Sequence, residues 1–65
     1  MKVSQLTYVV PNTVKIKILK HIADINYGTE YYGYAKRLPK DSLLNTRRVI
    51  KIHPVDVETL NIYIE

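Results

Sequence analysis

Hydrophobic side chains in the first segment of the chain recur at the spacing of a helix. Val3, Leu6 and Val10 lie three and four residues apart, and Pro11 prevents a helix from continuing. A short strand is the alternative, because residues 7–10 all favour extended backbone. We expect a short helix here and keep the strand as the competing prediction.

Residues 13–18 alternate between hydrophobic and polar side chains, which is typical of a strand with one buried face. The inner face would carry Val14, Ile16 and Ile18, and the outer face Thr13, Lys15 and Lys17. The alternation slips at Leu19, because Ile22 rather than Lys20 suits the interior. We therefore expect a bulge or a bend near Leu19 and Lys20.

A second strand is expected over residues 30–36, joined to the first as a hairpin by a loop at residues 24–29 that contains Asp, Asn and Gly. Its inner face is ambiguous, because a shift of one residue exchanges the two sets of side chains. We favour an inner set of Tyr31, Gly33 and Ala35, with Gly33 leaving space for a ring or a helix. This choice leaves Tyr32 and Tyr34 for solvent or a partner, and the opposite facing is the alternative.

The segment at residues 38–45 fits a single helical turn that folds onto the sheet. Pro39 suits the start of this turn, Asp41 suits its first residues, and Asn45 can end it. Leu43 and Leu44 would then pack onto the strands.

The last part of the chain predicts two further strands. Residues 48–53 and 60–65 both alternate with a period of two, and Pro54 closes the first of them. Residues 54–59 suit a hairpin loop, so the two strands should pair in antiparallel fashion. The shared inner face would carry Ile50, Ile52, Leu60, Ile62 and Ile64.

Together these elements predict one small α+β domain over residues 1–65. The expected fold is a small antiparallel sheet of about four strands, formed by two β-hairpins, with one or two short helices on one face. Its expected core consists of Val14, Ile16, Ile18, Ile22, Ala35, Leu43, Leu44, Ile50, Ile52, Leu60, Ile62 and Ile64. A chain of this size buries only about 60% of its unfolded surface, which argues against a deep catalytic cavity.

Basic residues concentrate in two segments of the chain, which carries a net charge of +4. Residues 1–20 contain four lysines and no acidic residue, and residues 36–51 contain six basic residues against Asp41. The other acidic residues lie between these segments and after them. If the two basic segments fold side by side, they create a surface for nucleic acid or for an acidic protein partner.

Metal and redox chemistry have little support in this composition. The chain has no Cys, which excludes a disulfide framework and a thiolate metal site and suits a reducing compartment. His21 and Asp24 lie three residues apart, as do His53 and Asp56, but no third His or Cys reinforces either pair. We interpret all four as surface residues.

Catalytic groups are equally sparse. Ser4 and Ser42 suit helix starts better than nucleophilic roles, and the acidic residues are scattered singly along the chain. Gly28 and Gly33 do not belong to a Gly-rich turn that could cradle phosphate. No apolar run approaches the roughly 20 residues that cross a bilayer, and no signal peptide is evident. We expect a cytoplasmic protein without enzymatic activity, cofactor or membrane partner.

The outward face of the predicted sheet is the stronger candidate for a binding site. By period two it would carry Lys15, Lys17, Val49, Lys51, His53, Asn61 and Tyr63, together with Tyr32 and Tyr34. Lysines neutralise phosphates and tyrosines offer stacking surfaces for bases, so nucleic acid is one candidate ligand. The residues that would carry this function are Lys15, Lys17, Arg47, Arg48 and Lys51. The same pattern also suits a sheet that binds nothing, because exposed Lys and Tyr keep a half-solvated sheet soluble.

Several segments also carry a resemblance to a known group of proteins. They are the strand at 13–16, the Tyr-Gly-Tyr-Ala-Lys strand at 32–36 running into Leu38 and Pro39, and the terminal hairpin from 49–54 to 60–64. In the style and order of these elements the chain resembles the small uncharacterised proteins encoded by phages and prophages of Gram-positive bacteria. The resemblance implies a role during infection or lysogeny in the host cytoplasm, commonly by binding and modulating a host or phage protein without a cofactor.

We therefore expect a non-enzymatic protein that acts by occupying the surface of a partner protein. Tyr32, Tyr34 and Tyr63 would provide the contact area, because aromatic side chains are favoured at interface hot spots. Nucleic-acid binding is the alternative function, and the pattern does not distinguish DNA from RNA. Self-association as a homodimer is a third hypothesis, since an open sheet edge can pair with that of a second copy.

Overall fold

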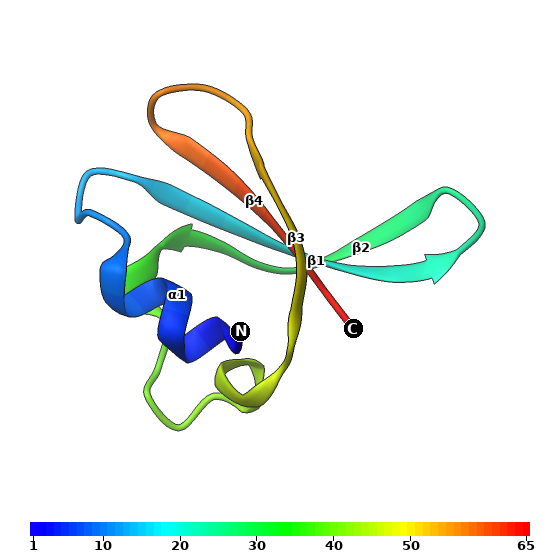
Figure 1. Ribbon diagram of the computed structural model, residues 1–65, viewed down its shortest axis with the longest axis horizontal. Coiled ribbons are helices and arrows are strands. Elements are labelled where there is room, and N and C mark those ends of the chain that lie inside the picture. The colour runs from blue at the N-terminus through cyan, green and yellow to red at the C-terminus, as the bar shows by residue number, and fades with distance from the viewer.

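The computed structural model describes residues 1–65 and contains a four-stranded sheet with a helix and two 3-10 helices on one side. In chain order the elements are α1 (Val3–Val9), β1 (Lys15–Ala23), β2 (Asn26–Tyr34), η1 (Ala35–Arg37), η2 (Leu43–Thr46), β3 (Val49–Pro54) and β4 (Thr59–Ile64). Figure 1 shows α1 and the connection from β2 to β3 on the same side of the strands. The predicted α+β class is confirmed.

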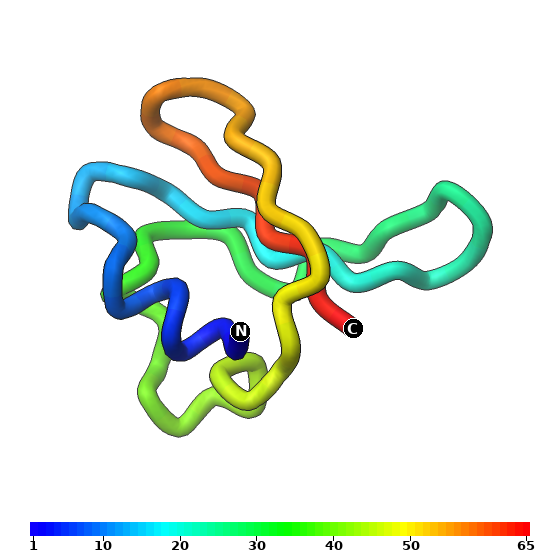
Figure 2. The backbone as a smooth tube through the Cα atoms, viewed as in Figure 1, coloured from blue at the N-terminus to red at the C-terminus, as the bar shows by residue number.

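The two predicted hairpins form and meet in the middle of the sheet. The strand order is β2-β1-β4-β3, and both hairpins are antiparallel. The central strands β1 and β4 are parallel, with Lys15 beside Thr59 and Lys20 beside Ile64, so the sheet is mixed rather than wholly antiparallel. This arrangement requires a crossover, which residues 35–48 supply by running from the end of β2 to the opposite end of the sheet, as the tube in Figure 2 shows.

The N-terminal segment is a helix, as predicted, rather than a strand. Val3 and Leu6 are buried on its inner side, and the cap residue Val10 is buried as well. The Gln5 side-chain oxygen accepts a hydrogen bond from the Lys2 backbone N–H at 2.8 Å, which satisfies one of the unpaired donors at the helix start. Tertiary packing of this apolar stripe therefore outweighs the extended propensity of its β-branched residues.

The core lies between the sheet and its covering layer. Its buried members are Val3, Leu6, Val10, Ile16, Ile18, Ala35, Leu38, Ile62 and Ile64, and Val14, Tyr31, Leu44, Val49 and Leu60 pack against it. Burial of one such aliphatic side chain contributes roughly 1.5–3 kcal/mol. The expected core is confirmed along β1 and β4, where Ile16, Ile18 and Ile62 are fully buried.

Four residues that were predicted for the core are exposed instead, namely Ile22, Leu43, Ile50 and Ile52. Each lies where an element ends, bends or reaches the edge of the sheet. Ile50 falls at a register shift between Val49 and Lys51, and Ile52 lies on the edge strand. The shift turns Val49 towards the core, although the alternation of residues 48–53 predicted Val49 on the outward face.

The first hairpin is longer than predicted. β1 continues to Ala23 and β2 begins at Asn26, so a tight turn at Asp24 and Ile25 replaces the expected loop at 24–29. Asp24 has a φ of 49°, a conformation that Asp tolerates better than most residues. A register shift does lie between Ile18 and Leu19, but its extra residue is Glu30 of β2, so the expected slip in the alternation of β1 at Leu19 is wrong. A second shift follows between His21 and Ala23, and it leaves Ile22 exposed.

The end of β2 has the facing that was favoured from the sequence. Tyr31 packs against the core, while Tyr32 and Tyr34 are exposed. Ala35 is buried as predicted, but it begins η1, because the strand ends at Tyr34 and not at residue 36. Gly33 has a φ of 156°, and a Cβ there would lie 3.1 Å from the Tyr31 hydroxyl. That hydroxyl donates a hydrogen bond to the Tyr34 carbonyl oxygen at 2.7 Å. Gly33 therefore leaves space for a ring, and the ring is that of Tyr31.

The predicted helical turn at residues 38–45 is wrong in its bounds. Two separate 3-10 helices form, and the second begins after Ser42, whose hydroxyl accepts a hydrogen bond from the Leu44 N–H at 3.2 Å. Leu44 packs against the core, but Leu43 is 84% exposed because a single short turn presents only one side to the sheet.

Candidate functional site

One face of the sheet carries no covering layer, and we call it the open face. Its residues alternate with the buried Ile16, Ile18 and Ile62, so the strand register assigns them. They are Lys15, Lys17, Leu19 and His21 of β1, Tyr27, Thr29, Tyr32 and Tyr34 of β2, Lys51 and His53 of β3, and Thr59, Asn61 and Tyr63 of β4. The register therefore brings together the predicted Lys15, Lys17, Lys51, Tyr32, Tyr34 and Tyr63 from four different strands.

Lys15 lies between two exposed tyrosine rings at one end of the open face. Its Nζ atom is 5.5 Å from the centroid of the Tyr34 ring and 5.9 Å from that of Tyr32. Both distances suit cation–π contacts. Tyr32 is 57% exposed and Tyr34 is 38% exposed, so both rings remain accessible to a ligand.

A second aromatic cluster lies towards the other end of the open face. The Tyr27 and Tyr63 rings meet edge to face at a centroid distance of 5.1 Å, and Tyr27 also meets His21 at 5.3 Å. The Lys51 Nζ atom lies 5.7 Å from the Tyr63 ring. Leu19 is buried although it belongs to the open face, and it pairs with Tyr63 in register. These rings therefore pack against one another, whereas no aromatic partner contacts Tyr32 or Tyr34.

Sequence reasoning missed His21 and Tyr27 as members of this surface. The Asn, Gly and Asp residues at 24–29 suggested a loop, whereas the strands continue and pair His21 with Tyr27. The alternation of β1 does continue from Lys15 to His21 on one face, and that signal could have placed His21.

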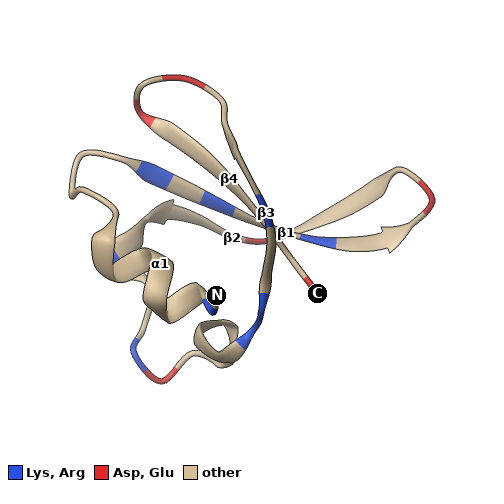
Figure 3. Cartoon of the chain, in the orientation of Figure 1, with Lys and Arg blue, Asp and Glu red and all other residues tan.

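Acidic residues are absent from every paired position of the four strands. Asp24 lies in the β1–β2 turn, Asp56 and Glu58 lie in the β3–β4 turn, and Glu30 falls at the bulge of β2. Figure 3 shows this separation, with basic segments along β1 and acidic segments at the tips of both hairpins. The lysines of the open face have no carboxylate partner, because Arg48 with Glu65 is the only ion pair in the structure.

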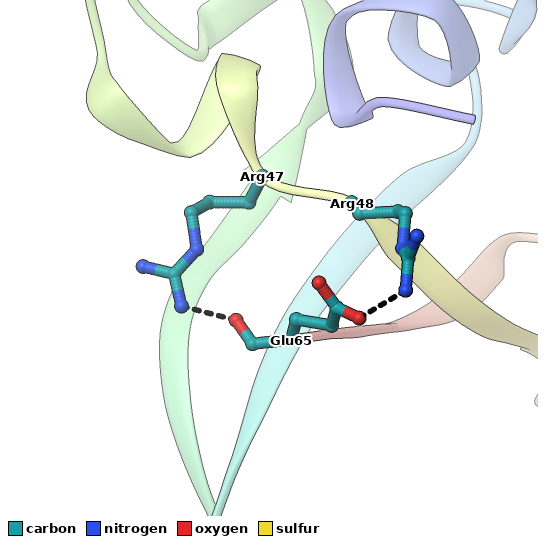
Figure 4. A network of polar contacts seen from close by, with 3 residues as sticks. All are labelled: Arg47, Arg48 and Glu65. Carbon is teal, nitrogen blue, oxygen red and sulfur yellow. Dashed lines mark hydrogen bonds and ion pairs between the residues drawn. The ribbon is translucent and has the colours of Figure 1, made fainter.

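Arg47 and Arg48 have a different environment from the lysines with which they were predicted. The Arg47 guanidinium donates a hydrogen bond to the Glu65 backbone oxygen, and the Arg48 guanidinium binds the Glu65 carboxylate (Figure 4). Both contacts join the start of β3 to the residue that follows β4. Glu65 therefore competes for these two arginines, which makes them weaker candidates for a binding role than Lys15, Lys17 and Lys51.

The covered side of the molecule has a groove between α1 and residues 35–45. Its polar lining includes Ser4, Thr7, Tyr8, Lys36, Lys40 and Asn45, and its volume is about 600 Å³. Lys36 and Lys40 are exposed there, on the opposite layer from the open face. They provide a reference set of lysines for any test of the open face.

Other kinds of site have weaker support in the structure. No group of three or more His, Asp or Glu side chains gathers in one place, and His21 Nε2 contacts the backbone oxygen of Asp24 rather than its carboxylate. Both edge strands, β2 and β3, are free of a further strand. No helix of this chain is both long enough and apolar enough to pass through a membrane.

Comparisons with known proteins found no matching family model, no similar curated protein and no similar solved structure. The predicted phage or prophage origin therefore rests on the order of elements in the sequence alone.

Proposed function

We propose that the protein binds nucleic acid through the open face of its sheet. The observation that carries this proposal is the combination of three unpaired lysines with four tyrosines on one uncovered surface that lacks carboxylates. Lys15, Lys17 and Lys51 supply positive charge for phosphates. Tyr32 and Tyr34 supply exposed aromatic rings for bases.

The placement of the acidic residues supports the same function. Asp24, Asp56 and Glu58 lie in the two hairpin turns, where none of them forms an ion pair with a lysine of the open face. A polyanion laid across the open face would meet cations along its path and acidic side chains only at the tips. This arrangement favours an extended anionic ligand over a small one.

A partner protein is the second candidate, and the β1–β2 hairpin favours it. The tip of this hairpin extends away from the rest of the molecule (Figure 1). Two aliphatic residues at the tip are exposed, Ile22 at 69% and Ile25 at 89%. These exposed aliphatic residues, with the exposed Tyr27 on the same part of the hairpin, suit a protein interface. A phage or host protein is the kind of partner that the sequence resemblance implies.

Fluorescence anisotropy with labelled oligonucleotides tests the first proposal. Fluorescein-labelled single strands and duplexes are titrated with the protein at low salt and at physiological salt. We expect binding that weakens steeply as salt is added, because each neutralised phosphate releases counterions. Absence of binding to every oligonucleotide at low salt would contradict the proposal and leave the protein partner as the favoured function.

Two double variants distinguish binding by the open face from binding that depends only on the net charge of the protein. Lys15→Glu with Lys17→Glu should abolish binding, whereas Lys36→Glu with Lys40→Glu changes net charge equally on the covered side and should leave most of the affinity. An equal loss in both double variants would show that net charge alone drives the association. Light scattering on the same samples determines whether the protein is a monomer or a homodimer.

A further inference from the structure

Two exposed tyrosines of the open face, Tyr32 and Tyr34, have a spacing that selects among nucleic acids. Tyr32 and Tyr34 are alternate residues of β2 on the same face. Alternate residues of an antiparallel strand lie about 6.8 Å apart. Bases stacked one on each ring would therefore be separated by about twice the 3.4 Å that separates stacked bases in one strand of a duplex.

Only an unpaired strand can meet this spacing. In a duplex the faces of the bases are covered by their neighbours, so a tyrosine ring cannot stack on them. A single strand can extend, separate its bases and place each one on a ring. The geometry of Tyr32 and Tyr34 therefore suits a single strand whose bases are unstacked from each other.

Lys15 completes the arrangement. Its Nζ atom lies 5.5 Å and 5.9 Å from the two ring centroids, so one cation serves both tyrosines. The phosphate that joins two consecutive nucleotides lies between their bases along the strand. Lys15 is therefore placed to neutralise the phosphate between the nucleotides that stack on Tyr32 and Tyr34.

We propose that this end of the open face is a dinucleotide site for single-stranded nucleic acid. One base stacks on Tyr32, the next stacks on Tyr34, and Lys15 pairs with the phosphate between them. This inference rests on the proposed nucleic-acid function and adds the strandedness of the ligand. The Tyr27 and Tyr63 rings, which pack against each other at 5.1 Å, do not form part of this site.

The test compares single strands with a duplex on the complete protein. The probes are fluorescein-labelled oligothymidylate, oligouridylate and oligoadenylate of about 12 nucleotides, with a mixed-sequence DNA duplex of the same length. We expect the thymidylate strand to bind about tenfold more tightly than the duplex at equal salt. Oligoadenylate should bind less tightly than oligothymidylate, because its bases stack on each other and must first separate. The uridylate strand shows whether the same site accepts RNA.

Variants of Tyr32 and Tyr34 test whether their rings are responsible for binding the single strand. Tyr32→Ala with Tyr34→Ala should weaken oligothymidylate binding about tenfold or more, since each base–ring stack is lost. Tyr32→Phe with Tyr34→Phe keeps the rings and should retain near wild-type affinity. Tyr8→Ala is the matched control, because Tyr8 is 90% exposed on α1 in the covering layer.

A measurement on the wild-type protein tests the same site without relying on variants that could misfold. The chain contains six Tyr and no Trp, so its fluorescence reports on tyrosine. Stacking of thymine bases should quench that emission during a titration, and the duplex should not. Equal affinity for duplex and single strand, together with unchanged binding after both Ala substitutions, would overturn the dinucleotide site. The nucleic-acid function would survive that result if the Lys15→Glu and Lys17→Glu variant still lost binding, whereas failure of all probes would overturn both proposals.

Discussion

The two faces of the sheet are built from the same strands but differ in the burial and the charge of their side chains. On the covered face, Ile16, Ile18 and Ile62 are fully buried beneath α1 and residues 35–48. On the open face, the residues between them include Lys15, Lys17 and Asn61, and no element covers them. One face therefore carries the stability of the fold, and the other is free to carry charge. Substitutions of neighbouring residues in one strand should therefore affect different properties, namely stability on the covered face and binding on the open face.

The largest expected effect comes from the covered face. Ile62→Ala removes a fully buried side chain and should lower the free energy of unfolding by about 2–5 kcal/mol, most of what a domain of this size possesses. Ile52→Ala is the matched control, because Ile52 pairs with Ile62 in register but is 40% exposed and should cost less than about 1 kcal/mol. Urea unfolding followed by circular dichroism measures both, and equal losses would show that the core extends to β3.

The glycines of β2 should give a smaller difference in stability. Gly33→Ala forces a φ of 156° on a residue with a Cβ and crowds the Tyr31 hydroxyl, so it should cost roughly 1–3 kcal/mol. Gly28→Ala meets only the Ile22 side chain, whose exposed end can rotate away, and should cost less. Thermal melts of the two variants test this order, which would be wrong if Gly28→Ala lowered the melting temperature further.

A lysine of the open face should change binding but hardly change stability. Lys17→Ala removes one phosphate contact, so the slope of log affinity against log salt should fall in magnitude by about 0.7 for a single strand. Its free energy of unfolding should stay within about 0.5 kcal/mol of the wild-type value. Lys36→Ala, on the covered side, should leave the slope unchanged, and the same fall in both variants would remove the distinction between the faces.

The smallest effect is expected at the edge between the two faces. Arg48 and Glu65 are 66% and 53% exposed, so Arg48→Ala should cost no more than about 1 kcal/mol and should cost less in high salt. Urea unfolding at low and high salt measures this difference, with Arg37→Ala as an exposed reference. A loss above 2 kcal/mol that salt does not reduce would mean that Glu65 holds the start of β3 more firmly than an exposed ion pair can.

Much of the fold could be predicted because alternation and helical spacing report directly on burial. The stripe of Val3, Leu6 and Val10 gave the helix, and the alternation in 13–18 and 60–65 gave the central strands. The parallel pairing of those strands was not predictable, since no local pattern records which strand becomes a neighbour. Ile50 was misplaced because the bulge next to Val49 has no signature in the sequence. Ile52 pairs with Ile62 as its alternation predicts, but it is exposed because β3 becomes an edge strand.

The candidate site was predicted in its chemistry and in part of its membership. The open face contains Lys15, Lys17, Lys51, Tyr32, Tyr34 and Tyr63, because these residues lie in stretches of the four strands where the alternation is not interrupted by a bulge. Arg47 and Arg48 could not be separated from them in advance, because their contacts with Glu65 depend on where β4 ends beside β3. His21 and Tyr27 were missed because a turn of two residues was mistaken for a loop of six.

The parallel pairing of β1 with β4 also sets the order in which the chain can fold. Each hairpin closes between neighbouring residues, which takes microseconds. Neither hairpin alone buries its inner face, and Ile18 meets Ile62 only when the two hairpins dock across a long intervening segment. Docking of two fluctuating hairpins, rather than formation of either one, should therefore limit the folding rate of this protein.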